Sequence, residues 1–290
     1  IKEGAIFIGF MSQHKNLDSV RILRDRKIST IAMELIPRIS RAQSMDALSS
    51  QASIAGYQAV LMAATYLDKY FPLLMTAAGT IQPAKIDIMG AGVAGLQAIA
   101  TAKRLGAVVE VSDIRPAVKE QVESLGGRFI DFPMDESGEG EGGYARELTP
   151  EQRKAQQEIV RQKVVAADAV ITTALVPGRP APKLITKDMV AEMREGAVIV
   201  DLAVEQGGNC ELSKSGEMIL AEGVTIIGHP NMPAATPADA SLLYARNIQA
   251  LLLSLLAEGE VVLNLEDEIL AGALLTHNGE VRHAPTAEAL

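Results

Sequence analysis

The chain has 290 residues, a formal net charge of −9 and a hydrophobic fraction of 48%. This length allows two domains of ordinary size, and the acidic balance argues against nucleic acid or an anionic membrane surface as a general partner. The single cysteine, Cys210, excludes an internal disulfide, and it has no basic neighbour that would activate it, so we expect a structural thiol.

The sequence offers no candidate metal site and no membrane-spanning run. The apolar run Ala250–Ala257 is far shorter than the ~18 residues that would cross a membrane, and we predict that it is the buried face of a helix. The chain begins at Ile1, and no signal or transit sequence is visible. The chain has four histidines, His14, His229, His277 and His283. Their positions lack the spacing of metal ligands.

The first 70 residues predict a small α/β piece followed by a long helix. Ala5–Phe10 and Thr30–Met33 are expected as strands, with a helix over Asn16–Arg26 between them. This piece is too small to close a core of its own. Ser44–Tyr70 has little charge and predicts a long helix that runs between two domains.

The polar segment Pro37–Ser50 leads into that long helix. Helical spacing puts Gln43, Asp46 and Ser49 on one face, and Arg38 precedes them. N-capping and a solvated surface would account for these residues. A helix start at the mouth of a cleft would also present an amide, a carboxylate and a cation to a ligand, so both interpretations stand at this point.

Residues 81 to about 230 alternate between strand and helix. Most of the expected strands are continuous apolar or β-branched runs, which is typical of parallel strands buried on both faces. Right-handed crossovers then give a doubly wound, Rossmann-type parallel sheet, with its ligand crevice at the carboxyl ends of the strands. The expected strands are Ile86–Met89, Val108–Val111, Arg128–Phe132, Ala169–Thr173, Ala197–Leu202 and Val224–Ile227, and the expected helices are Gly92–Leu105, Pro116–Leu125, Pro150–Val165 and Thr186–Met193.

The stretch from Lys85 to Arg115 contains the dinucleotide-binding fingerprint in its full context. A strand runs into a G-x-G-x-x-G turn, and a helix and a second strand follow. Gly90 permits the tight turn, Gly92 lets backbone N–H groups approach a pyrophosphate, and Gly95 lets the helix pack close to the strand. This order of elements predicts a bound dinucleotide.

Asp113 stands at the end of the second strand, where a carboxylate accepts hydrogen bonds from the adenosine ribose hydroxyls. A 2′-phosphate there would meet like-charge repulsion, so the fingerprint predicts NAD(H) rather than NADP(H). Arg115 is close enough in sequence to hold a 2′-phosphate, but beside Asp113 we expect its effect to be minor.

The segment Asp135–Arg146 reads DESGEGEGGYAR, and this composition cannot bury enough apolar surface to stay ordered alone. A flexible surface insertion is one interpretation. The other is a lid, with Gly142-Gly143 as its hinge and Tyr144 as the group that docks on a ligand.

After the sheet, Ala238–Ala257 predicts a second long helix that returns the chain to the first domain. Asn278-Gly279 within Ala271–Ala284 indicates a hairpin. We therefore expect a partial first α/β domain over residues 1–50, a nucleotide-binding domain with its linking helix over 51–240, and a return helix and tail over 241–290. Two long helices between the domains would leave a cleft.

Taken together, the motifs resemble those of the NAD(H)-binding component (domain I of the alpha subunit) of proton-translocating NAD(P) transhydrogenases, a family related to alanine dehydrogenase. The resemblance covers nearly the whole chain, and it implies a further portion before Ile1 that would complete the first domain. Its markers are MELIPRISRAQSMDALSSQ (Met33–Gln51), TAAGTIQPAK (Thr76–Lys85), MGAGVAGLQAIATAKRLGA (Met89–Ala107), EGGYAREL (Glu141–Leu148), ITTALVPGRPAPKLIT (Ile171–Thr186) and VIVDLAVEQGGNCELS (Val198–Ser213).

The resemblance implies roles at the matching positions only. The catalytic, nicotinamide-positioning residues would be Arg38, Gln43, Asp46 and Ser49, with Ile39, Ser40 and Arg41 as further cofactor contacts. Gly90, Gly92, Val93, Ala94 and Gly95 match the pyrophosphate turn, and Asp113, Ile114 and Arg115 match the adenosine-ribose region. Gly143 and Tyr144 match a mobile loop that closes over the nucleotide, and Gln156 and Leu175 match further NAD contacts.

The resemblance also implies a Si/B-specific transhydrogenase, in which NADH on this component passes hydride directly to NADP⁺ on a separate component. No protein nucleophile or acid–base cycle takes part, so two rings must be positioned in a dry near-attack geometry, with Asp46 and Gln43 fixing the carboxamide and the ring. The implied partners are the NADP(H)-binding component, a membrane proton-channel component and a second copy in a homodimer. The implied location is the bacterial cytoplasm, peripheral to the inner membrane through the partner subunits.

Two alternatives stay open. An alanine dehydrogenase-like amino-acid oxidoreductase needs a proton acceptor at the amine. The position of that family's histidine, after the strand Ala5–Phe10, is here Ser12, with His14 two residues further on, and the family's acidic residue before Gln206 is here Glu205. The other alternative is a non-enzymatic NAD(H)-sensing module that signals through Asp135–Arg146.

Overall fold

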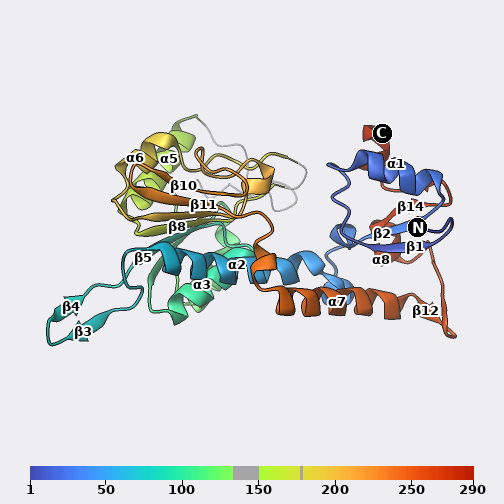
Figure 1. Ribbon diagram of the computed structural model, residues 1–290, viewed down its shortest axis with the longest axis horizontal. Helices are drawn as coiled ribbons and strands as arrows, with labels where there is room; N and C mark the ends of the chain where they lie inside the picture. The colour runs from blue at the N-terminus through green and yellow to red at the C-terminus, as the bar shows by residue number, and fades with distance from the viewer. Residues whose placement is uncertain (133–149, 177–178) are drawn as a thin grey trace. The chain divides into compact units, whose positions relative to one another are not determined.

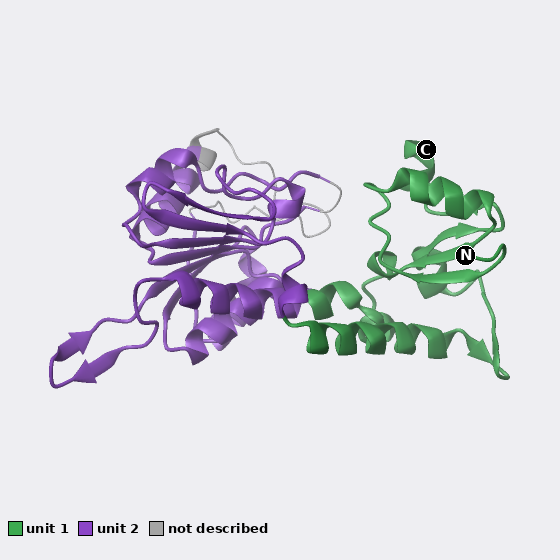
Figure 2. Cartoon of the chain, in the orientation of Figure 1, with its two compact units in different colours: residues 1–51, 236–290 green, residues 52–235 purple. Residues whose placement is uncertain are grey.

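The computed structural model describes residues 1–132, 150–176 and 179–290. The chain forms two compact units, which are coloured separately in Figure 2. Unit 1 combines Ile1–Gln51 with Thr236–Leu290, and unit 2 is Ala52–Ala235. Helix α2 (Ala47–Tyr66) begins in the first and ends in the second.

Unit 2 is built on a seven-stranded sheet with the order β10-β11-β9-β8-β5-β6-β7. Neighbouring strands are parallel except β10, which runs antiparallel to β11. From β5 the chain moves outward to β6 and β7 and then returns to place β8 on the other side of β5. This reversal is the topological switch point at which doubly wound sheets bind ligands, so the predicted fold class is confirmed. The strands are β5 (Lys85–Met89), β6 (Val108–Ser112), β7 (Arg128–Phe129), β8 (Ala169–Thr172), β9 (Val198–Asp201), β10 (Glu217–Ala221) and β11 (Val224–Gly228).

Helices cover both faces of this sheet (Figure 1). On one face, Ile86 and Ile88 of β5 pack among residues of α2 and α3 (Val93–Arg104). On the other face, Met89 packs among residues of α5 (Pro150–Ala166) and α6 (Lys187–Glu192). All residues of β8 and β9 are buried, which explains why every residue but the last of each strand is apolar. The remaining helices of the unit are η3 (Pro116–Val118), α4 (Lys119–Ser124), η4 (Val204–Gln206) and η5 (Met232–Ala235).

Unit 1 contains a four-stranded sheet whose strands come from both ends of the chain, in the order β1-β2-β14-β15. β1 and β2 are parallel, and β14 joins β2 antiparallel. Val20 and Leu23 of α1 pack on one face, and Ile269 and Leu270 of α8 pack with Leu251 of α7 in the other core cluster. The elements are β1 (Ile6–Gly9), α1 (Leu17–Asp25), β2 (Ser29–Ala32), η1 (Met33–Leu35), η2 (Ser40–Met45), α7 (Pro237–Ser254), α8 (Glu268–Ala273), β14 (Leu274–His277), β15 (Glu280–Val281) and α9 (Ala284–Ala289).

The hairpin predicted at Asn278-Gly279 is confirmed. Asn278 has a φ of 49° and Gly279 a φ of 86°, and they connect β14 to β15. Two consecutive residues with positive φ make the two-residue turn that matches the twist of a hairpin.

The helix predicted over Ser44–Tyr70 is wrong at both ends. Residues Ser40–Met45 form η2, Asp46 has a ψ of 85°, and α2 begins at Ala47. The α2 helix ends at Tyr66. Gln43 therefore does not share a continuous helix face with Ser49, because the backbone from Gln43 to Asp46 is not α-helical.

The prediction for Ala250–Ala257 is correct only in part. The helix α7 ends at Ser254. Leu251 and Leu255 are buried, whereas Leu252 and Leu253 are exposed, because a helix on the surface of a core buries a single stripe.

Several strands were not predicted. They are the hairpin β3 (Leu74–Thr76) with β4 (Gly79–Ile81), the edge strand β10, and the short pair β12 (Leu256–Ala257) with β13 (Glu260–Val261). The strand predicted over Arg128–Phe132 is also shorter, since β7 contains Arg128 and Phe129 alone.

Candidate functional site

The glycine turn lies at the carboxyl end of β5, beside the switch point. Gly90 has a φ of 106°, and its N–H donates to the Ser112 carbonyl at 2.8 Å. A Cβ on Gly90 would lie 2.4 Å from Thr173 Oγ1, and a Cβ on Gly95 would lie 1.8 Å from the Gly90 carbonyl oxygen. Any side chain at these two positions would collide with the turn, so both must be glycine for the turn to close.

Gly92 is different, because a Cβ placed on this residue would meet open space. It has a φ of −77°, which any residue adopts, and no atom of the described residues lies within 4 Å of a Cβ placed there. The space lies at the N-terminus of α3. The first hydrogen bond of this helix runs from Leu96 N to Gly92 O at 2.8 Å, so the N–H groups before Leu96 have no partner within the helix. Open space beside unpaired donors and the positive end of a helix dipole fits a phosphate group.

Helix α2 supports the same turn from its other side. A Cβ on Gly56 would lie 2.0 Å from the Ala94 carbonyl oxygen. The backbone of α2 therefore lies directly against the first turn of α3, and only glycine allows this approach.

Asp113 follows β6 and accepts four hydrogen bonds, one from Ala91 and three from Arg115. Its Oδ2 accepts the Ala91 N–H at 2.7 Å, and its Oδ1 accepts the Arg115 N–H at 2.8 Å. The Arg115 guanidinium binds both oxygens, at 3.0 and 2.9 Å. Burial acts to raise the pKa of Asp113, but the hydrogen bonds from Arg115 and Ala91 lower it below its ordinary value. The group is therefore a carboxylate at neutral pH, and it holds the arginine that the sequence left as a competing phosphate ligand.

Two buried side chains shape the loops after β8 and β9, and the sequence analysis missed both. Asp201 accepts from Thr172 Oγ1, Ala203 N and Cys210 N, each at 3.0 Å, and from Ser213 Oγ. Asn209 holds the backbone of Ala174 in both directions, with its Oδ1 3.1 Å from the N–H and its Nδ2 2.9 Å from the carbonyl. A signal was present, since Asp201 ends a buried strand and Asn209 follows two glycines.

The predicted contacts Leu175 and Gln156 both lie in unit 2. Leu175 lies three residues after the end of β8 and is 48% exposed, and β8 ends at the edge of the sheet that also holds the glycine turn. Gln156 is half-buried on α5. Val93 and Ala94 are in the first turn of α3, and Ile114 is exposed beside Asp113. Gly143 and Tyr144, with the whole of Asp135–Arg146, lie outside the described residues.

The residues expected around a nicotinamide lie in unit 1. Asp46 caps α2 by accepting the Ser49 N–H at 2.9 Å and the Ser49 hydroxyl at 2.6 Å. Arg41 forms a two-bond ion pair with Asp267, at 2.8 and 3.2 Å. The remaining members are exposed or half-buried around η2, and they are Arg38, Ile39, Ser40 and Gln43.

The loop after β1 holds no acid or base at the position that an alanine dehydrogenase would require. Ser12 occupies it, with its N–H 2.5 Å from Glu34 Oε1. The same carboxylate accepts the Met11 N–H at 2.9 Å, so Glu34 serves to hold the loop. His14 is exposed two residues later.

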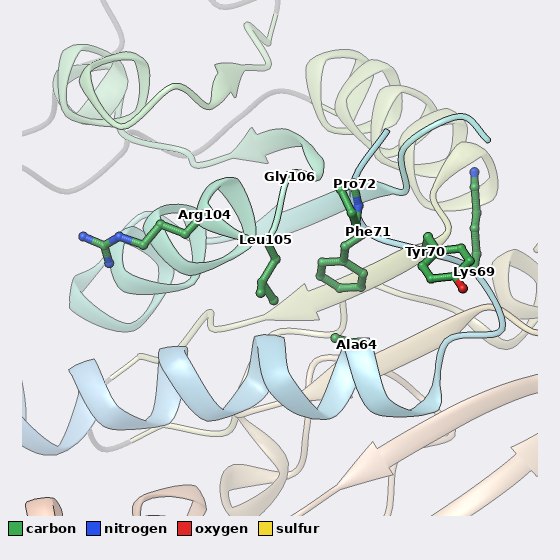
Figure 3. Close-up of a pocket in the computed structure, with 8 residues that line it drawn as sticks. All are labelled: Ala64, Lys69, Tyr70, Phe71, Pro72, Arg104, Leu105 and Gly106. Atoms are coloured by element: carbon green, nitrogen blue, oxygen red, sulfur yellow. The ribbon is translucent and has the colours of Figure 1, made fainter. Parts of the chain in front are cut away.

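An open groove of about 510 Å³ lies at the amino end of the unit 2 sheet (Figure 3). Phe71 and Leu105 point toward α2, where Ala64 lies. The Phe71 carbonyl accepts the Ala84 N–H at 3.0 Å, directly before β5 begins. The glycine turn is at the opposite end of β5, so this groove is separate from the candidate site.

Within the described ranges, His, Cys, Asp and Glu side chains form no group of three that could hold a metal ion. Cys210 is fully buried, and burial raises the pKa of its thiol. Among the helices that the structure describes, none combines the length and apolar character needed to span a bilayer.

Comparison with known proteins gives two family matches that together cover most of the chain. Residues 59–284 match the model described as "Alanine dehydrogenase/PNT, C-terminal domain", and residues 1–55 match the corresponding N-terminal domain. The chain is 52% identical over 287 residues to an NAD(P) transhydrogenase subunit alpha protein of Rhodospirillum rubrum, covering 98% of this chain and 75% of that one.

Similar solved structures include a transhydrogenase and an alanine dehydrogenase. Transhydrogenase from Sinorhizobium meliloti has a TM-score of 0.86 and 48% identity, covering 97% of this chain and 76% of that chain. An L-alanine dehydrogenase has a TM-score of 0.78 and 25% identity, covering 99% and 75%. The alanine dehydrogenase is thus the more distant of the two in sequence and in structure.

Proposed function

The chain belongs to the alanine dehydrogenase/PNT family, and from this premise we propose that it is the NAD(H)-binding component of a proton-translocating NAD(P) transhydrogenase. Identity favours this branch, at 52% to the Rhodospirillum rubrum transhydrogenase subunit against 25% to the L-alanine dehydrogenase of known structure. The alternative within the family is amino-acid oxidation.

One observation supports nucleotide binding above the others: the open space at Gly92 beside the N-terminus of α3. The pyrophosphate of NAD(H) would accept hydrogen bonds from the first-turn N–H groups, including those of Val93 and Ala94. The adenosine ribose would bind at Asp113, where a carboxylate disfavours a 2′-phosphate. Gln156 and Leu175 are proposed as further contacts of the same nucleotide.

The chemistry proposed for the site is positioning. Hydride passes from NADH on this chain to NADP⁺ on a partner, so the protein need neither donate nor accept a proton in that step. Asp46 and Gln43 would orient the carboxamide and the ring, with Arg38 and Ser49 beside them and with Ile39, Ser40 and Arg41 as neighbouring contacts. We propose transfer with Si/B stereospecificity.

Amino-acid oxidation is less well supported because it needs a general base at the substrate amine. Ser12 has no basic group, and both oxygens of the nearby Glu34 are within 3.2 Å of the Met11 N–H. A hydride exchange between two nucleotides has no such requirement.

The proposed partners are the NADP(H)-binding component, the membrane component that couples the exchange to proton movement, and a second copy of this chain. The β3–β4 hairpin supports the homodimer. It extends from unit 2 (Figure 1), and an isolated hairpin is marginally stable in water. Met75 is 78% exposed and Leu73 is 52% exposed, which is an apolar surface suited to a partner copy. We propose a cytoplasmic location, peripheral to the bacterial inner membrane through these partners.

A reconstitution tests the proposal. The chain is mixed with the NADP(H)-binding component of a transhydrogenase, and NADH-dependent reduction of an NADP⁺ analogue is followed. Activity supports the proposal. Verified NADH binding without activity would favour an NAD(H)-sensing module, and deamination of L-alanine with NAD⁺ would favour the amino-acid oxidoreductase.

A further inference from the structure

One peptide group of the glycine turn is held at both of its ends. Its carbonyl oxygen belongs to Gly90 and lies 3.1 Å from Thr173 Oγ1. Its N–H belongs to Ala91 and donates to Asp113 Oδ2 at 2.7 Å. Thr173 directly follows β8 and Asp113 directly follows β6, so the two neighbours of β5 each supply one restraint.

This peptide group needs the restraint because of the residue before it. Gly90 has no Cβ, so steric repulsion alone does not select one orientation of the peptide that follows it. A flip of this peptide would turn the Gly90 carbonyl away from Thr173 and the Ala91 N–H away from Asp113, in the turn that leads directly into α3. The hydroxyl and the carboxylate together select one orientation.

The Gly90 carbonyl depends on the Thr173 hydroxyl more than the neighbouring Met89 carbonyl does. The Met89 carbonyl also lies 3.1 Å from Thr173 Oγ1, but it already accepts the Thr173 N–H at 2.8 Å. The Gly90 oxygen is crowded on its other side by Gly95, where a Cβ would come within 1.8 Å. Removing the hydroxyl would therefore take away its donor in a place where packing leaves little room for another.

We propose that Thr173 is a positioning residue, whose hydroxyl orients the Gly90–Ala91 peptide so that the first-turn N–H groups of α3 meet the pyrophosphate of a bound dinucleotide. This inference rests on the nucleotide binding proposed above. Thr173 acts through the turn and touches no reacting atom. Its contribution is specific to ligands that contain a pyrophosphate.

The test compares Thr173→Val, Thr173→Ser and wild type in titrations with NADH, ADP and adenosine. Loss of one neutral hydrogen bond predicts that Thr173→Val binds NADH and ADP about tenfold more weakly. Adenosine, which has no phosphate, is expected to bind Thr173→Val and wild type alike. Thr173→Ser keeps the hydroxyl and should restore the affinity for NADH and ADP. Thr173→Ala replaces the valine variant if circular dichroism shows that the latter is unfolded.

Thr101→Val is the matched control. Thr101 is buried on α3, and its Oγ1 donates to the Gln97 carbonyl at 2.8 Å, so this variant also removes a hydroxyl–carbonyl bond in unit 2. We expect it to bind NADH as wild type does. Equal loss of NADH affinity in Thr101→Val and Thr173→Val, or equal loss for adenosine, would reduce Thr173 to general stability and overturn the inference.

The remaining outcomes separate this inference from the proposed function. If wild type binds NADH and Thr173→Val binds it within about twofold of wild type, only the role of Thr173 is overturned. If folded wild type binds neither NADH nor ADP, the nucleotide site itself is wrong, and the inference falls with it.

Discussion

Asp46 and Ser49 form a closed pair at the start of α2, in which both carboxylate oxygens of Asp46 accept a hydrogen bond from Ser49, one from its N–H at 2.9 Å and one from its hydroxyl at 2.6 Å. The N–H bond satisfies an otherwise unpaired donor of the first helical turn. The sequence allowed two interpretations of this segment, a cap and a nicotinamide contact. The structure shows the cap, and the same side chain is only half-buried, which leaves it accessible for the proposed second role.

Asp46→Asn separates the two roles. Asparagine caps helices about as well as aspartate, so α2 should begin at the same residue and the melting temperature should change little. The negative charge at the proposed nicotinamide site is lost. We expect the single-turnover hydride-transfer rate to fall by about tenfold while the NADH dissociation constant changes less. Equal losses of rate and affinity would contradict an orienting role.

Gly92→Ala should preserve the fold and impair nucleotide binding. Its φ is ordinary and its Cβ would meet no described atom, so we expect the unfolding free energy to stay within about 0.5 kcal/mol of wild type. The added methyl group would occupy the space assigned to the pyrophosphate. NADH titration should show at least a tenfold weaker complex, on the order of one lost hydrogen bond or more.

Gly95→Ala and Gly56→Ala provide the contrast. Their Cβ atoms would lie 1.8 Å from the Gly90 oxygen and 2.0 Å from the Ala94 oxygen, and both of these are backbone atoms. We expect each variant to lose about 1–3 kcal/mol or more of unfolding free energy in denaturant titrations. Stable, fully folded variants at either position would show that the packing around the turn is looser than described.

Asp113→Ala should weaken the discrimination against NADPH. The substitution removes the carboxylate that would repel a 2′-phosphate, and it releases the Arg115 guanidinium that this carboxylate binds at 2.9 and 3.0 Å. An arginine freed in this way is suited to bind a phosphate. We expect the ratio of NADPH to NADH affinity to rise by about tenfold, measured by calorimetric titration of both nucleotides.

The double variant Asp113→Ala with Arg115→Ala identifies the cause. If the freed arginine binds the 2′-phosphate, the gain in NADPH affinity should disappear in the double variant. An undiminished preference for NADH in Asp113→Ala would place the selectivity elsewhere in the protein.

Asp87 is a buried carboxyl group in the middle of β5. It is 2% exposed, and neither of its oxygens has a hydrogen-bond partner among the described residues. Burial and the neighbouring Glu110 raise the pKa of Asp87 to about 7, against an opposing effect of Lys163. Glu110 is itself paired with Lys163 at 2.9 Å and lies 3.6 Å from Arg128.

This raised pKa predicts how stability depends on pH. Between about pH 4 and about pH 7 the folded chain keeps a proton on Asp87 that the unfolded chain has released, so this group's contribution to stability is lost as the pH rises through that interval. Asp87→Asn removes the effect. We expect the unfolding free energy of the variant, relative to that of wild type, to increase by up to about 4 kcal/mol from about pH 4 to about pH 7. Above about pH 7 this difference should stay constant. A pH-independent difference in denaturant titrations would contradict this.

Asp168 is the control, because its environment has the opposite effect. Its oxygens accept Lys69 Nζ and Arg194 Nε, each at 2.8 Å, and the Lys85 N–H at 2.7 Å. Burial acts to raise its pKa, but these partners lower it below the ordinary value. Its contribution to stability is therefore present near neutral pH and lost only as the pH falls through the lowered pKa. Asp168→Asn should destabilise the chain at neutral pH, where Asp87→Asn should compare more favourably with wild type than it does at acidic pH.

The hairpins show where prediction from the sequence succeeds and fails. Asn278-Gly279 was identified because Asn-Gly is the strongest signal of a two-residue turn. Glu222-Gly223 and Glu258-Gly259 have nearly the same positive φ angles, and they connect β10 to β11 and β12 to β13. Glutamate rarely adopts a positive φ, so its place in these turns is decided by the pairing of the strands on either side.

The candidate site divides in the same way. Gly90, Gly92, Gly95 and Asp113 could be predicted because their spacing along one strand, turn, helix and strand is local. The contacts of Thr173, Asp201 and Asn209 could not be predicted in full, because each of these residues has a partner 29 to 84 residues away that it meets only when the sheet forms. The end of η2 was also misjudged, since a helical period alone does not reveal where a 3₁₀ turn gives way to an α-helix.

Cys210, fully buried in the segment after β9, leaves the chain without an accessible thiol in its described part. An engineered Leu175→Cys, at an exposed position in the segment after β8, would thus be the preferred attachment point for a maleimide fluorophore. The chain also has no tryptophan, so its intrinsic emission would not interfere with that of a labelled or tryptophan-containing partner. Nucleotide arrival and partner docking could therefore be followed as separate optical signals in a single mixing experiment.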